Sequence, residues 1–541
     1  MDKKILVSEA VFADAGPNFI SNPEPDAGET ISISIRVFRD NFGDDANEGI
    51  WLNILSYINP DSETVMQKFA CRKVKSAGLF DYYAAEIKMP ASKINYYFSL
   101  EHGGLLYYYN GNGFVTNLND DFNFTIVPGF KTPDWAKSAT MYQIYVDRFA
   151  NGDTANDVAN YEYLYLGKLA RKVENWHSPV ENLDICNFYG GDLAGVMDKM
   201  AYLRDLGVQA IYFNPLFVSP SNHKYDIQDY DYIDPHYGVI INDGKDGTDT
   251  LGFDTLHNRH ARMYIKRTTD KANLEASNQL MIRLIELAHS YGIKVILDGV
   301  FNHCGAFNKW LDSEGFYKAA DANDGYESGA LQDENSIYRD YFVWNSDGYY
   351  EGWWGHDNHP KLNFEGSESL YEYILHIGAK WVSPPFNADG WRLDVAADLG
   401  RSKEFNHKFW RDFRNAVKTA NPNALILAEH YGDPSDWLDG TQWDSIMNYD
   451  AFMEPVSWFF TGMQKHSERF EAGMYGNAGA FEGAMRYWMS KLPYGVLSVA
   501  MNQLSNHDHS RFLTRTNMKP GRLHTVGAFE ADMGTNKPAM M

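Results

Sequence analysis

Cysteine is scarce in this sequence, and long apolar runs are absent. The 541 residues include three cysteines, Cys71, Cys186 and Cys304, which stand far apart. Their odd number and their spacing argue against a disulfide framework and against a cysteine-based metal site. The mean hydropathy is −0.44, and no uncharged apolar run approaches the roughly 18 residues that a membrane-spanning helix needs. The sequence therefore favours a protein of a reducing compartment, with no membrane partner.

Positive charge is also in short supply. There are 48 lysines and arginines against 72 acidic residues, which gives a net charge of −24. That field repels phosphate backbones and argues against a nucleic-acid partner. The N-terminus, MDKKILVSEA, has three strongly apolar residues after its lysines, whereas a signal peptide needs an apolar core of roughly 7–15 residues. We expect a cytoplasmic protein; the alternative is that an export signal has been removed.

What the sequence does contain is a globular composition rich in aromatic residues. Hydrophobic residues make up 44% and charged residues 22%, and this usage excludes a disordered chain. Aromatic residues reach 15%, which is high. Aromatic rings stack on the C–H faces of sugars, but they also fill protein cores. Composition alone therefore only hints at a neutral ligand.

The first 130 residues follow the pattern of an all-β domain. The segment ISISIRVF (31–38) alternates apolar and polar residues, as a half-buried strand does. Further strand-like segments follow, separated by turns of Gly, Asp, Asn and Pro, and no segment of helical period interrupts them. We predict an N-terminal β-sandwich over residues 1–130.

Residues 131–541 alternate strand-like and helix-like segments. Repeated βα units with apolar strands predict a parallel sheet, and seven such strands favour a (β/α)8 TIM barrel. The strand segments are MYQIYVDRF, AIYFNPLF, KVILDGVFNH, DGWRLDVAAD, ALILAEHYGD, SIMNYDAF and VLSVAMNQLSNHD. The last of these ends at Asp508. We expect no eighth strand and no C-terminal β-domain in the residues that follow, TVGAFEADMGTNKPAMM included.

Two stretches interrupt the barrel rhythm. Residues 238–272 are first rich in Gly and Asp and then basic, which predicts a long loop. Residues 304–368 are rich in aromatics, which predicts an inserted subdomain. Connections of this length are usually functional. In a barrel they would lie at the carboxyl ends of the strands, where active sites form.

Four acidic residues close apolar strand segments: Asp298, Asp394, Glu429 and Asp508. A single such acid most often caps a helix or anchors a loop. Four on different strands would gather in the mouth of one barrel, with histidines beside two of them.

The spacing of Arg392 and Asp394 suggests how two of these acids would differ. Positions i and i+2 of a strand share a face, so the guanidinium would lower the pKa of Asp394. Glu429 has no cation beside it in sequence and would keep a raised pKa. One ionised and one protonated carboxyl group is the pair that glycoside hydrolysis requires. A rival interpretation is a Mg²⁺ site for enolate chemistry, with a histidine as base because no strand ends in lysine.

Several motifs resemble those of a known family. DGVFNHCG (298–305), GWRLDVAAD (390–398), ILAEHYGD (426–433) and LSNHDHSR (504–511) resemble, in order, the four signature regions of the α-amylase family of glycoside hydrolases. HPKLN (359–363) resembles the fifth region, usually MPKLN, of its neopullulanase, cyclomaltodextrinase and maltogenic-amylase branch. Residues 188–238 also look like that branch, and an N-terminal β-sandwich is typical of it.

The resemblance implies roles for the acidic residues. Asp394 matches the nucleophile, Glu429 the general acid/base, and Asp508 the third carboxylate, which grips sugar hydroxyls. Arg392 matches the arginine that orients the nucleophile.

The resemblance also implies a set of substrate-binding residues. His303 and His507 match histidines that bind the sugar in the cleaved subsite, and Tyr225 matches a tyrosine that stacks on it. Trp353 forms either an acceptor-side platform, together with Trp354, or plain packing. The full set is Arg392, His303, His507, Tyr225, Asp298, Asn302, Trp353 and His430.

Some positions depart from the branch or have a structural role in it. Asp298 and Asn302 match residues that support the loop near the site. His430 stands where the branch more often has an apolar residue, Ala397 and Asp398 replace a usual Asn-Glu pair, and His359 replaces Met. These departures leave the preferred substrate open.

The loop NGDTAND (151–157) carries hard oxygen ligands of the kind that Ca²⁺ prefers. Taken alone it is a weak signal, because such clusters are usually turns. Similar members of the branch bind calcium in such a loop, completed from the GGD segment. The implied structural Ca²⁺ ligands are Asn151, Asp153, Asn156, Asp157, Gly190 and Asp192. No organic cofactor is implied.

The sequence therefore predicts a retaining α-glucan hydrolase. Its substrates would be maltodextrins, cyclodextrins or pullulan, cleaved at α-1,4 and also α-1,6 bonds through a covalent glycosyl-enzyme, with transglycosylation as a further activity. Two alternatives stay open: a non-catalytic α-glucan-binding protein on the same fold, and an α-glucosidase acting on short maltooligosaccharides. The resemblance also implies a homodimer, with the β-sandwich covering a neighbour's active site.

Overall fold

The computed structural model describes residues 6–42, 49–57, 64–181, 184–243, 250–252, 255–319, 325–466, 469–519, 522–523 and 526–527. The chain forms two compact units, one of residues 1–138 with 430–541 and one of residues 139–429. This division by packing does not test the predicted domains, 1–130 and 131–541, which stay predictions. Among the described residues no helix is both long and apolar enough to span a membrane.

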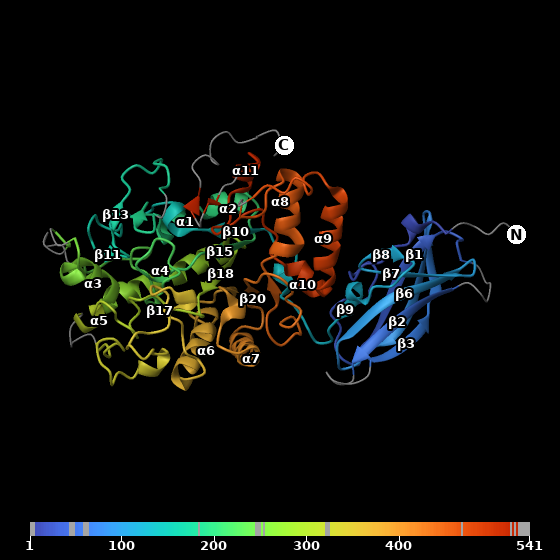
Figure 1. The fold of residues 1–541 in the computed structure, drawn as a ribbon, viewed down its shortest axis with the longest axis horizontal. Helices are drawn as coiled ribbons and strands as arrows, with labels where there is room; N and C mark the ends of the chain where they lie inside the picture. The colour runs from blue at the N-terminus through green and yellow to red at the C-terminus, as the bar shows by residue number, and fades with distance from the viewer. Residues whose placement is uncertain are drawn as a thin grey trace. The chain divides into compact units, whose positions relative to one another are not determined.

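The N-terminal part of the first unit is an antiparallel β-domain (Figure 1). In strand β1 (Thr30–Phe38) the side chains alternate between buried and half-buried positions, which confirms the predicted strand. One sheet has the order β1-β5-β4, and the other has the order β3-β2-β6-β7-β8, with β9 paired to β6. Ile33 and Ile35 of the first sheet share a buried core with Leu52 and Phe98 of the second, so the two sheets form a sandwich.

The remaining elements of this domain are strands and single turns of 3-10 helix. Their bounds are η1 Ser8–Ala10, β2 Gly49–Tyr57, β3 Thr64–Ala70, β4 Arg72–Ala77, β5 Phe80–Lys88, β6 Ile94–His102, β7 Leu105–Asn110, β8 Gly113–Val115, η2 Asp120–Phe122, β9 Phe124–Ile126 and η3 Asp134–Ala136.

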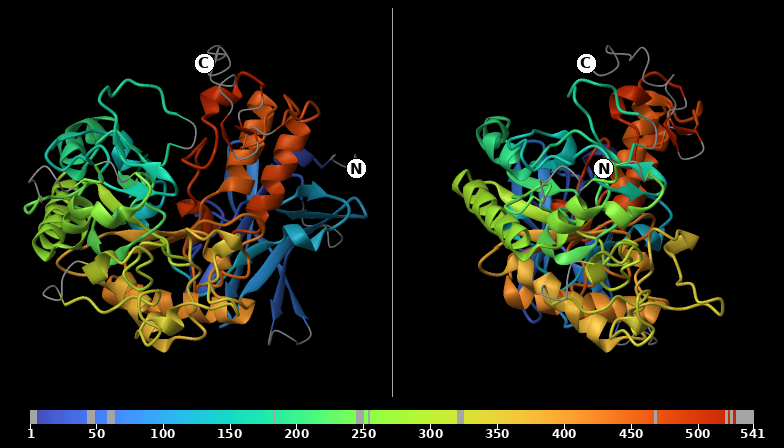
Figure 2. Two further views of the ribbon diagram at one scale, coloured as in Figure 1. Left: turned by 60° about the vertical axis from the view of Figure 1, so that its left-hand side comes forward. Right: turned by 90° about the vertical axis from the view of Figure 1, so that its left-hand side faces the viewer.

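Helices are the main regular structure in the described part of residues 430–541 of the same unit. Helices α8 (Glu454–Thr461) and α9 (Ala478–Ser490) lie side by side, with the Phe459 and Phe481 rings 5.0 Å apart (Figure 2). The other elements are β21 Ser445–Ile446, η9 Tyr449–Met453, α10 Tyr494–Val499, α11 Phe512–Arg515, β22 Arg522–Leu523 and β23 Val526–Gly527. Most of the segment from 525 to 541 lies outside the described residues, so the expectation of no eighth strand stays an expectation.

One predicted strand is wrong. The segment VLSVAMNQLSNHD forms helix α10 and then a single bridge residue, Met501, which pairs in parallel with Met447. Pro493 precedes the helix, and its carbonyl accepts a bond from Leu497. A short apolar run fits a buried helix as well as a buried strand, and periodicity alone does not separate them. Asp508 therefore does not follow directly on a strand.

The second unit contains a parallel sheet with the order β10-β15-β18-β19-β20. The strands are β10 Met141–Ile144, β15 Ala210–Phe213, β18 Lys294–Gly299, β19 Gly390–Leu393 and β20 Leu425–Ala428. The last four are almost completely buried. Neighbouring strands follow one another along the chain, as in a (β/α) barrel, so the predicted α/β fold is confirmed.

Helices in the connections cover this sheet. Trp391 of β19 donates its indole N–H to the carbonyl of Gly378 in α6, at 2.9 Å, and Figure 1 shows α6 and α7 side by side. Helix α4 starts at the cap Asp270, whose carboxylate accepts two backbone N–H bonds, and it is followed by Gly292 at φ 74°. The helices are α1 Leu193–Asp198, α2 Met200–Asp205, α4 Lys271–Ser290, α6 Glu368–Val382 and α7 Lys403–Ala420.

One of the two long insertions contains more structure than expected. Residues 238–272 were predicted to be a loop, but their basic part forms η5 (Asn258–His260) and helix α3 (Arg262–Thr269). Residues 244–249 and 253–254 lie outside the described residues. Tyr264 of α3 is buried in an aromatic cluster, which explains why this part is helical. Smaller elements are η4 Val146–Arg148, β11 Leu164–Tyr165, β12 Lys168–Leu169, β13 Arg171–Lys172, β14 Asn187–Phe188, β16 Phe217–Val218, β17 Asp229–Ile233, α5 Phe316–Ala319, η6 Arg339–Tyr341, η7 Trp353–Gly355 and η8 Ala396–Asp398.

Candidate active site

Sheet register brings one arginine and three acids to the same face. Asp298 of β18 is the register partner of Arg392 in β19, and Arg392 is in turn the partner of Leu427 in β20. Partners in adjacent strands share a face, and so do residues two apart in one strand. Asp394 and Glu429, each two residues beyond a member of this row, therefore project from the same face. The backbone continues the ladder there, because the Glu429 N–H donates to Leu393 at 2.9 Å.

The guanidinium of Arg392 is fully buried and contacts all three carboxylates. Its Nη1 lies 2.9 Å from Oδ1 of Asp394 and 3.0 Å from Oδ1 of Asp298. Its Nη2 lies 2.9 Å from Oε2 of Glu429. The strand period predicts the contact of Arg392 with Asp394. It does not predict the contact with Glu429, because these residues are far apart in sequence and meet across neighbouring strands.

Val395, directly after Asp394, has a left-handed backbone with φ 36° and ψ 47°. Such a conformation is strained for a β-branched residue. The N–H of the same residue donates to Oε2 of Glu429 at 3.0 Å. Glu429 is thus held by one side-chain cation and one backbone donor.

Asp298 and Tyr225 belong to one buried hydrogen-bond network. The hydroxyls of Tyr225 and Tyr212 donate to Oδ2 of Asp298, at 2.8 and 2.6 Å. Burial raises the pKa of Asp298, against the lowering effect of Arg392, and burial raises the pKa of both tyrosines well above the usual range. The Asn214 amide donates to Tyr225 at 3.2 Å. Tyr225 is therefore fixed from two sides.

His303 lies between two aromatic side chains. Its ring stacks on Trp353, with centroids 5.0 Å apart and planes inclined by 10°, and meets the edge of His359 at 4.8 Å. Burial, with help from the His359 charge, lowers the pKa of His303 well below its usual range, so its imidazole is neutral at physiological pH. The Trp353 indole donates to Oδ2 of Asp398 at 3.0 Å.

Asn302 and Trp354 have contrasting environments. Asn302 is 1% exposed, its Nδ2 lies 3.3 Å from Nδ1 of His303, and its backbone carbonyl accepts a bond from Leu362. It therefore links the end of β18 to the HPKLN segment. Trp354 is 82% exposed, with φ 52°, and its ring centroid lies 6.0 Å from that of Trp353.

Asp508, His507 and His430 belong to the other compact unit. Nε2 of His507 lies 3.3 Å from Oδ2 of Asp508, and the Asp508 side chain is 42% exposed. The Asp508 N–H donates to Oδ1 of Asn506 at 3.0 Å. His430 is half-buried and packs against the stacked rings of Trp437 and Trp443.

The NGDTAND loop is folded around buried oxygens. The Asn151 amide donates to Oδ1 of Asp157 at 2.7 Å, and Oδ2 of Asp157 lies 2.7 Å from Nζ of Lys172. The buried Oδ1 atoms of Asn151 and Asn156 accept no hydrogen bond. Gly190 has φ 84°, and a Cβ there would lie 2.3 Å from Oδ1 of Asp157. Only glycine therefore fits at this position.

The other two predicted calcium ligands have different environments. Asp192 is buried and caps helix α1, and its oxygens accept the backbone N–H bonds of Gly152, Asp153 and Gly195 at 2.6–3.0 Å. Asp153 is exposed and accepts the N–H of Ala155. No cluster of three or more His, Cys, Asp or Glu suited to a metal occurs in the described part of the chain. Two unpartnered amide oxygens and the Asp157 carboxylate nevertheless fit a hard cation.

Sequence reasoning missed several residues of this site. Tyr212 is the register partner of Ile296, two residues before Asp298, so the two-residue period alone could have placed its hydroxyl beside that acid. Asp398 was noted only as a departure, yet it also accepts a bond from Lys361 through its carbonyl, at 2.9 Å. No feature of the sequence predicts the left-handed backbone of Val395.

Comparison with known proteins gives matches over most of the chain. Residues 143–245 and 276–531 match the alpha amylase catalytic domain, and residues 9–128 match the alpha amylase N-terminal ig-like domain. The chain is 33% identical over 480 residues to neopullulanase 2 of Thermoactinomyces vulgaris, which covers 85% of this chain and 66% of that protein. It is also 33% identical over 469 residues to a cyclomaltodextrinase of Geobacillus thermopakistaniensis, covering 84% and 65%.

A solved structure of a similarly named enzyme also matches this chain. A cyclomaltodextrinase aligns with a TM-score of 0.58 and 29% identity, over 94% of this chain and 73% of that one. The chain spans just under two thirds of the length of the two sequence relatives.

Proposed function

The chain belongs to the α-amylase family, and we propose that it hydrolyses α-glucosidic bonds of maltodextrins, cyclodextrins or pullulan with retention of configuration. The observation that carries this proposal is the Arg392 guanidinium, which contacts Asp394 and Glu429 at 2.9 Å each. This shared cation holds the two buried carboxyl groups close together, as a nucleophile and a general acid/base that act on one bond require.

In the first step Asp394 attacks the anomeric carbon and forms an ester, while Glu429 gives its proton to the departing glycosidic oxygen. The ester removes the negative charge of Asp394, while Arg392 stays in contact with Glu429. In the second step Glu429 takes a proton from water, the water oxygen attacks the anomeric carbon, and Asp394 departs. A sugar acceptor in place of water gives transglycosylation.

Other residues have binding roles in this proposal. Neutral His303 exchanges hydrogen bonds with a sugar hydroxyl without adding charge, and Trp353 holds its ring in place. Tyr225 presents an aromatic face, since Asp298 fixes its hydroxyl. The role of third carboxylate falls to Asp508, and that of a further sugar ligand to His507, from their place in the motif LSNHD.

Two substitutions test the roles of the acids. Asp394→Asn and Glu429→Gln should each lower the turnover of a 4-nitrophenyl maltoside on the order of 10³-fold or more. Calorimetry should show that β-cyclodextrin still binds. The matched control is Asp205→Asn, at a side chain that is 68% exposed. NMR of the first product should show the α-anomer; a β-anomer would exclude retention.

The same assays separate the alternatives. Binding of cyclodextrin without turnover by the wild-type chain would favour a non-catalytic glucan-binding protein. Turnover of maltose and maltotriose with none of cyclodextrin or pullulan would favour an α-glucosidase.

We also propose that the NGDTAND loop binds a structural Ca²⁺. Asn151, Asn156 and Asp157 would hold it, with a backbone oxygen at Gly190, because the two amide oxygens are buried without a hydrogen bond. The ion would neutralise the Asp157 carboxylate and tie the loop together; it would take no part in the chemistry. Asp153 and Asp192 would support the loop through their backbone contacts.

A homodimer is the proposed assembly. Its support, beyond the resemblance, is the number of exposed apolar side chains on the β-domain, among them Met66, Val74 and Leu105, each at least 60% exposed. Surfaces of this kind commonly mark protein interfaces. Sedimentation of the full chain tests it: a monomer at micromolar concentration would exclude it.

A further inference from the structure

The second unit contains a cavity whose lining residues have no part in the proposed chemistry. It has a volume of about 400 Å³, within the range of small-molecule sites, roughly 300–1,000 Å³. Its walls come from the hairpin β11–β12, from the segment before η5, and from two parts of the 304–368 insertion. These segments are long connections that follow strands of the parallel sheet, where ligand sites commonly form.

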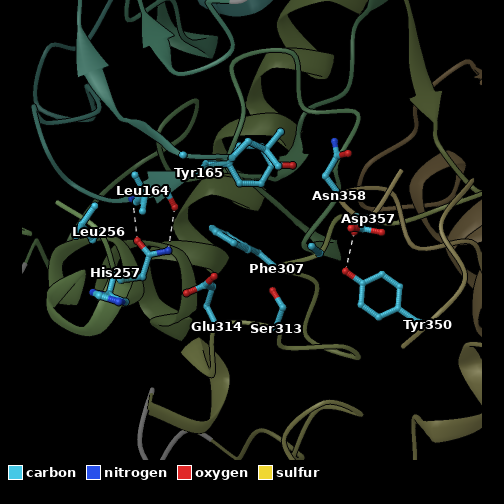
Figure 3. Close-up of a pocket in the computed structure, with 14 residues that line it drawn as sticks. Leu164, Tyr165, Leu256, His257, Phe307, Ser313, Glu314, Tyr350, Asp357 and Asn358 are labelled. Atoms are coloured by element: carbon cyan, nitrogen blue, oxygen red, sulfur yellow. Dashed lines mark hydrogen bonds between the residues drawn. The ribbon is translucent and has the colours of Figure 1, made fainter. Parts of the chain in front are cut away.

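The floor and the mouth of this cavity are apolar. The rings of Tyr165 and Phe307 meet edge to face at 5.1 Å and are almost fully buried. Leu256 and Leu166 flank the mouth and are 77% and 53% exposed. Figure 3 shows the Glu314 carboxylate among the polar side chains around these rings. Exposed leucines beside polar groups suit a ligand with C–H faces and hydroxyl edges.

The frame of the cavity is rigid. The side chain of Asn258 accepts the N–H of Leu164 at 2.8 Å and donates to its carbonyl at 2.9 Å, as a strand neighbour would. The Tyr350 hydroxyl donates to the carbonyl of Asp357 at 2.7 Å. Loops fixed in this way lose little entropy on binding.

Charge narrows the class of ligand. None of the described lining residues is a lysine or an arginine, whereas Glu314 and Asp357 are acidic, and the chain carries a net charge of −24. Phosphates and carboxylates are therefore repelled. No metal-binding cluster includes these acids within the described residues. With anions and metal ions excluded, a neutral polyhydroxylated ligand fits this cavity.

The cavity also adjoins the candidate active site. Asn358 lines it, the next residue is His359, and the His359 ring meets the edge of His303 at 4.8 Å. We propose that this cavity binds a second stretch of α-glucan, away from the bond being cleaved. The proposal rests on the proposed function only in naming the ligand as an α-glucan.

Two readouts on the full chain test this second site. Leu256→Arg places a bulky charge at the mouth, and Ile337→Arg, at a 64% exposed residue of the same unit, is the matched control. For the variant at 256 we expect KM for soluble amylose to rise at least fivefold, with KM for 4-nitrophenyl maltoside and both kcat values unchanged. Equal effects on the two substrates, or none, would overturn the proposal.

The second readout does not depend on catalysis. In an Asp394→Asn background, calorimetry with maltoheptaose should show two sites, and adding Leu256→Arg should leave one. A single site in both proteins would overturn the proposal, even if the chain proved to be a non-catalytic binder. If the wild-type chain lacked turnover but the two sites were present, the proposed function would fail and the second site would stand.

Discussion

The backbone N–H of Val395 donates a 3.0 Å hydrogen bond to Oε2 of Glu429, from a valine held in the left-handed region at φ 36°. The left-handed turn directly follows Asp394, so it sets the direction of the chain beyond the proposed nucleophile. The residue that contacts the second acid therefore adopts a conformation that costs on the order of 1–3 kcal/mol.

Val395→Gly should remove this strain. Glycine adopts positive φ readily, so we expect the free energy of unfolding to stay level or to rise by up to about 1 kcal/mol. Replacing a half-buried valine by glycine at a position with negative φ would lower the free energy of unfolding. Urea unfolding at pH 7 measures the difference. We also expect kcat to fall, since the Glu429 contact becomes less rigid. A loss of stability above about 1 kcal/mol would contradict the role of strain.

Arg392→Met should destabilise the chain strongly. The variant leaves three buried carboxylates without their shared cation, and breaking a buried ion pair costs about 3–5 kcal/mol. Chemical unfolding at pH 7 should show that loss. Arg392→Lys keeps the charge but lacks the planar guanidinium. This variant should therefore lose less of the free energy of unfolding than the methionine variant, but more than none. A methionine variant as stable as the wild type would show that the guanidinium contacts contribute nothing to folding.

Asp398→Ala should weaken substrate binding through Trp353. The variant removes the acceptor of the Trp353 indole N–H, and a hydrogen bond to a charged group contributes about 1.5–3 kcal/mol. With the ring free to leave His303, we expect KM for maltotriose to rise about tenfold, with a smaller change in kcat. The indole fluorescence should shift as well. Asp347→Ala, at an exposed residue, should change neither quantity.

The sequence predicts this site where its geometry follows from strand period. Arg392 and Asp394 are two residues apart, and they do share a face. The contact of Arg392 with Glu429 depends on which strands are neighbours, which period alone does not give. The fold shows the same limit: Val496 lies in an apolar run that fits either a strand or a helix, and Pro493 and the local packing make it helical.

His236 gives the chain a pH-dependent contribution to stability. Its Nδ1 lies 2.9 Å from Asp234 and its Nε2 2.9 Å from Glu162, while Lys224 and Arg267 pair with the other oxygens of those two acids. The ring is buried, and the carboxylates, Glu162 first, raise the pKa of His236 against the effect of burial.

The direction of the pH effect follows from that raised pKa. The charged ring stabilises the fold fully below the pKa of an unfolded histidine, about 6.5, and this contribution is lost as pH rises through the higher folded pKa. The free energy of unfolding should therefore fall more on His236→Gln at pH 6 than at pH 9. Urea titrations at both values measure this, and an equal loss at the two pH values would show that the ring is neutral when folded.

Calcium should stabilise the chain through Asn156. A ligand present at 100 times its Kd adds about 2.7 kcal/mol to the free energy of unfolding, so Tm should rise on adding CaCl₂ to chelator-treated protein. Asn156→Ala removes one of the buried unpartnered oxygens and should reduce that rise, whereas Asn335→Ala, at an exposed residue, should leave it unchanged. Mg²⁺ at the same concentration should act weakly, because it demands near-ideal octahedral geometry. A wild-type Tm that did not respond to Ca²⁺ would contradict the calcium site. Lys172 alone would then neutralise the Asp157 carboxylate.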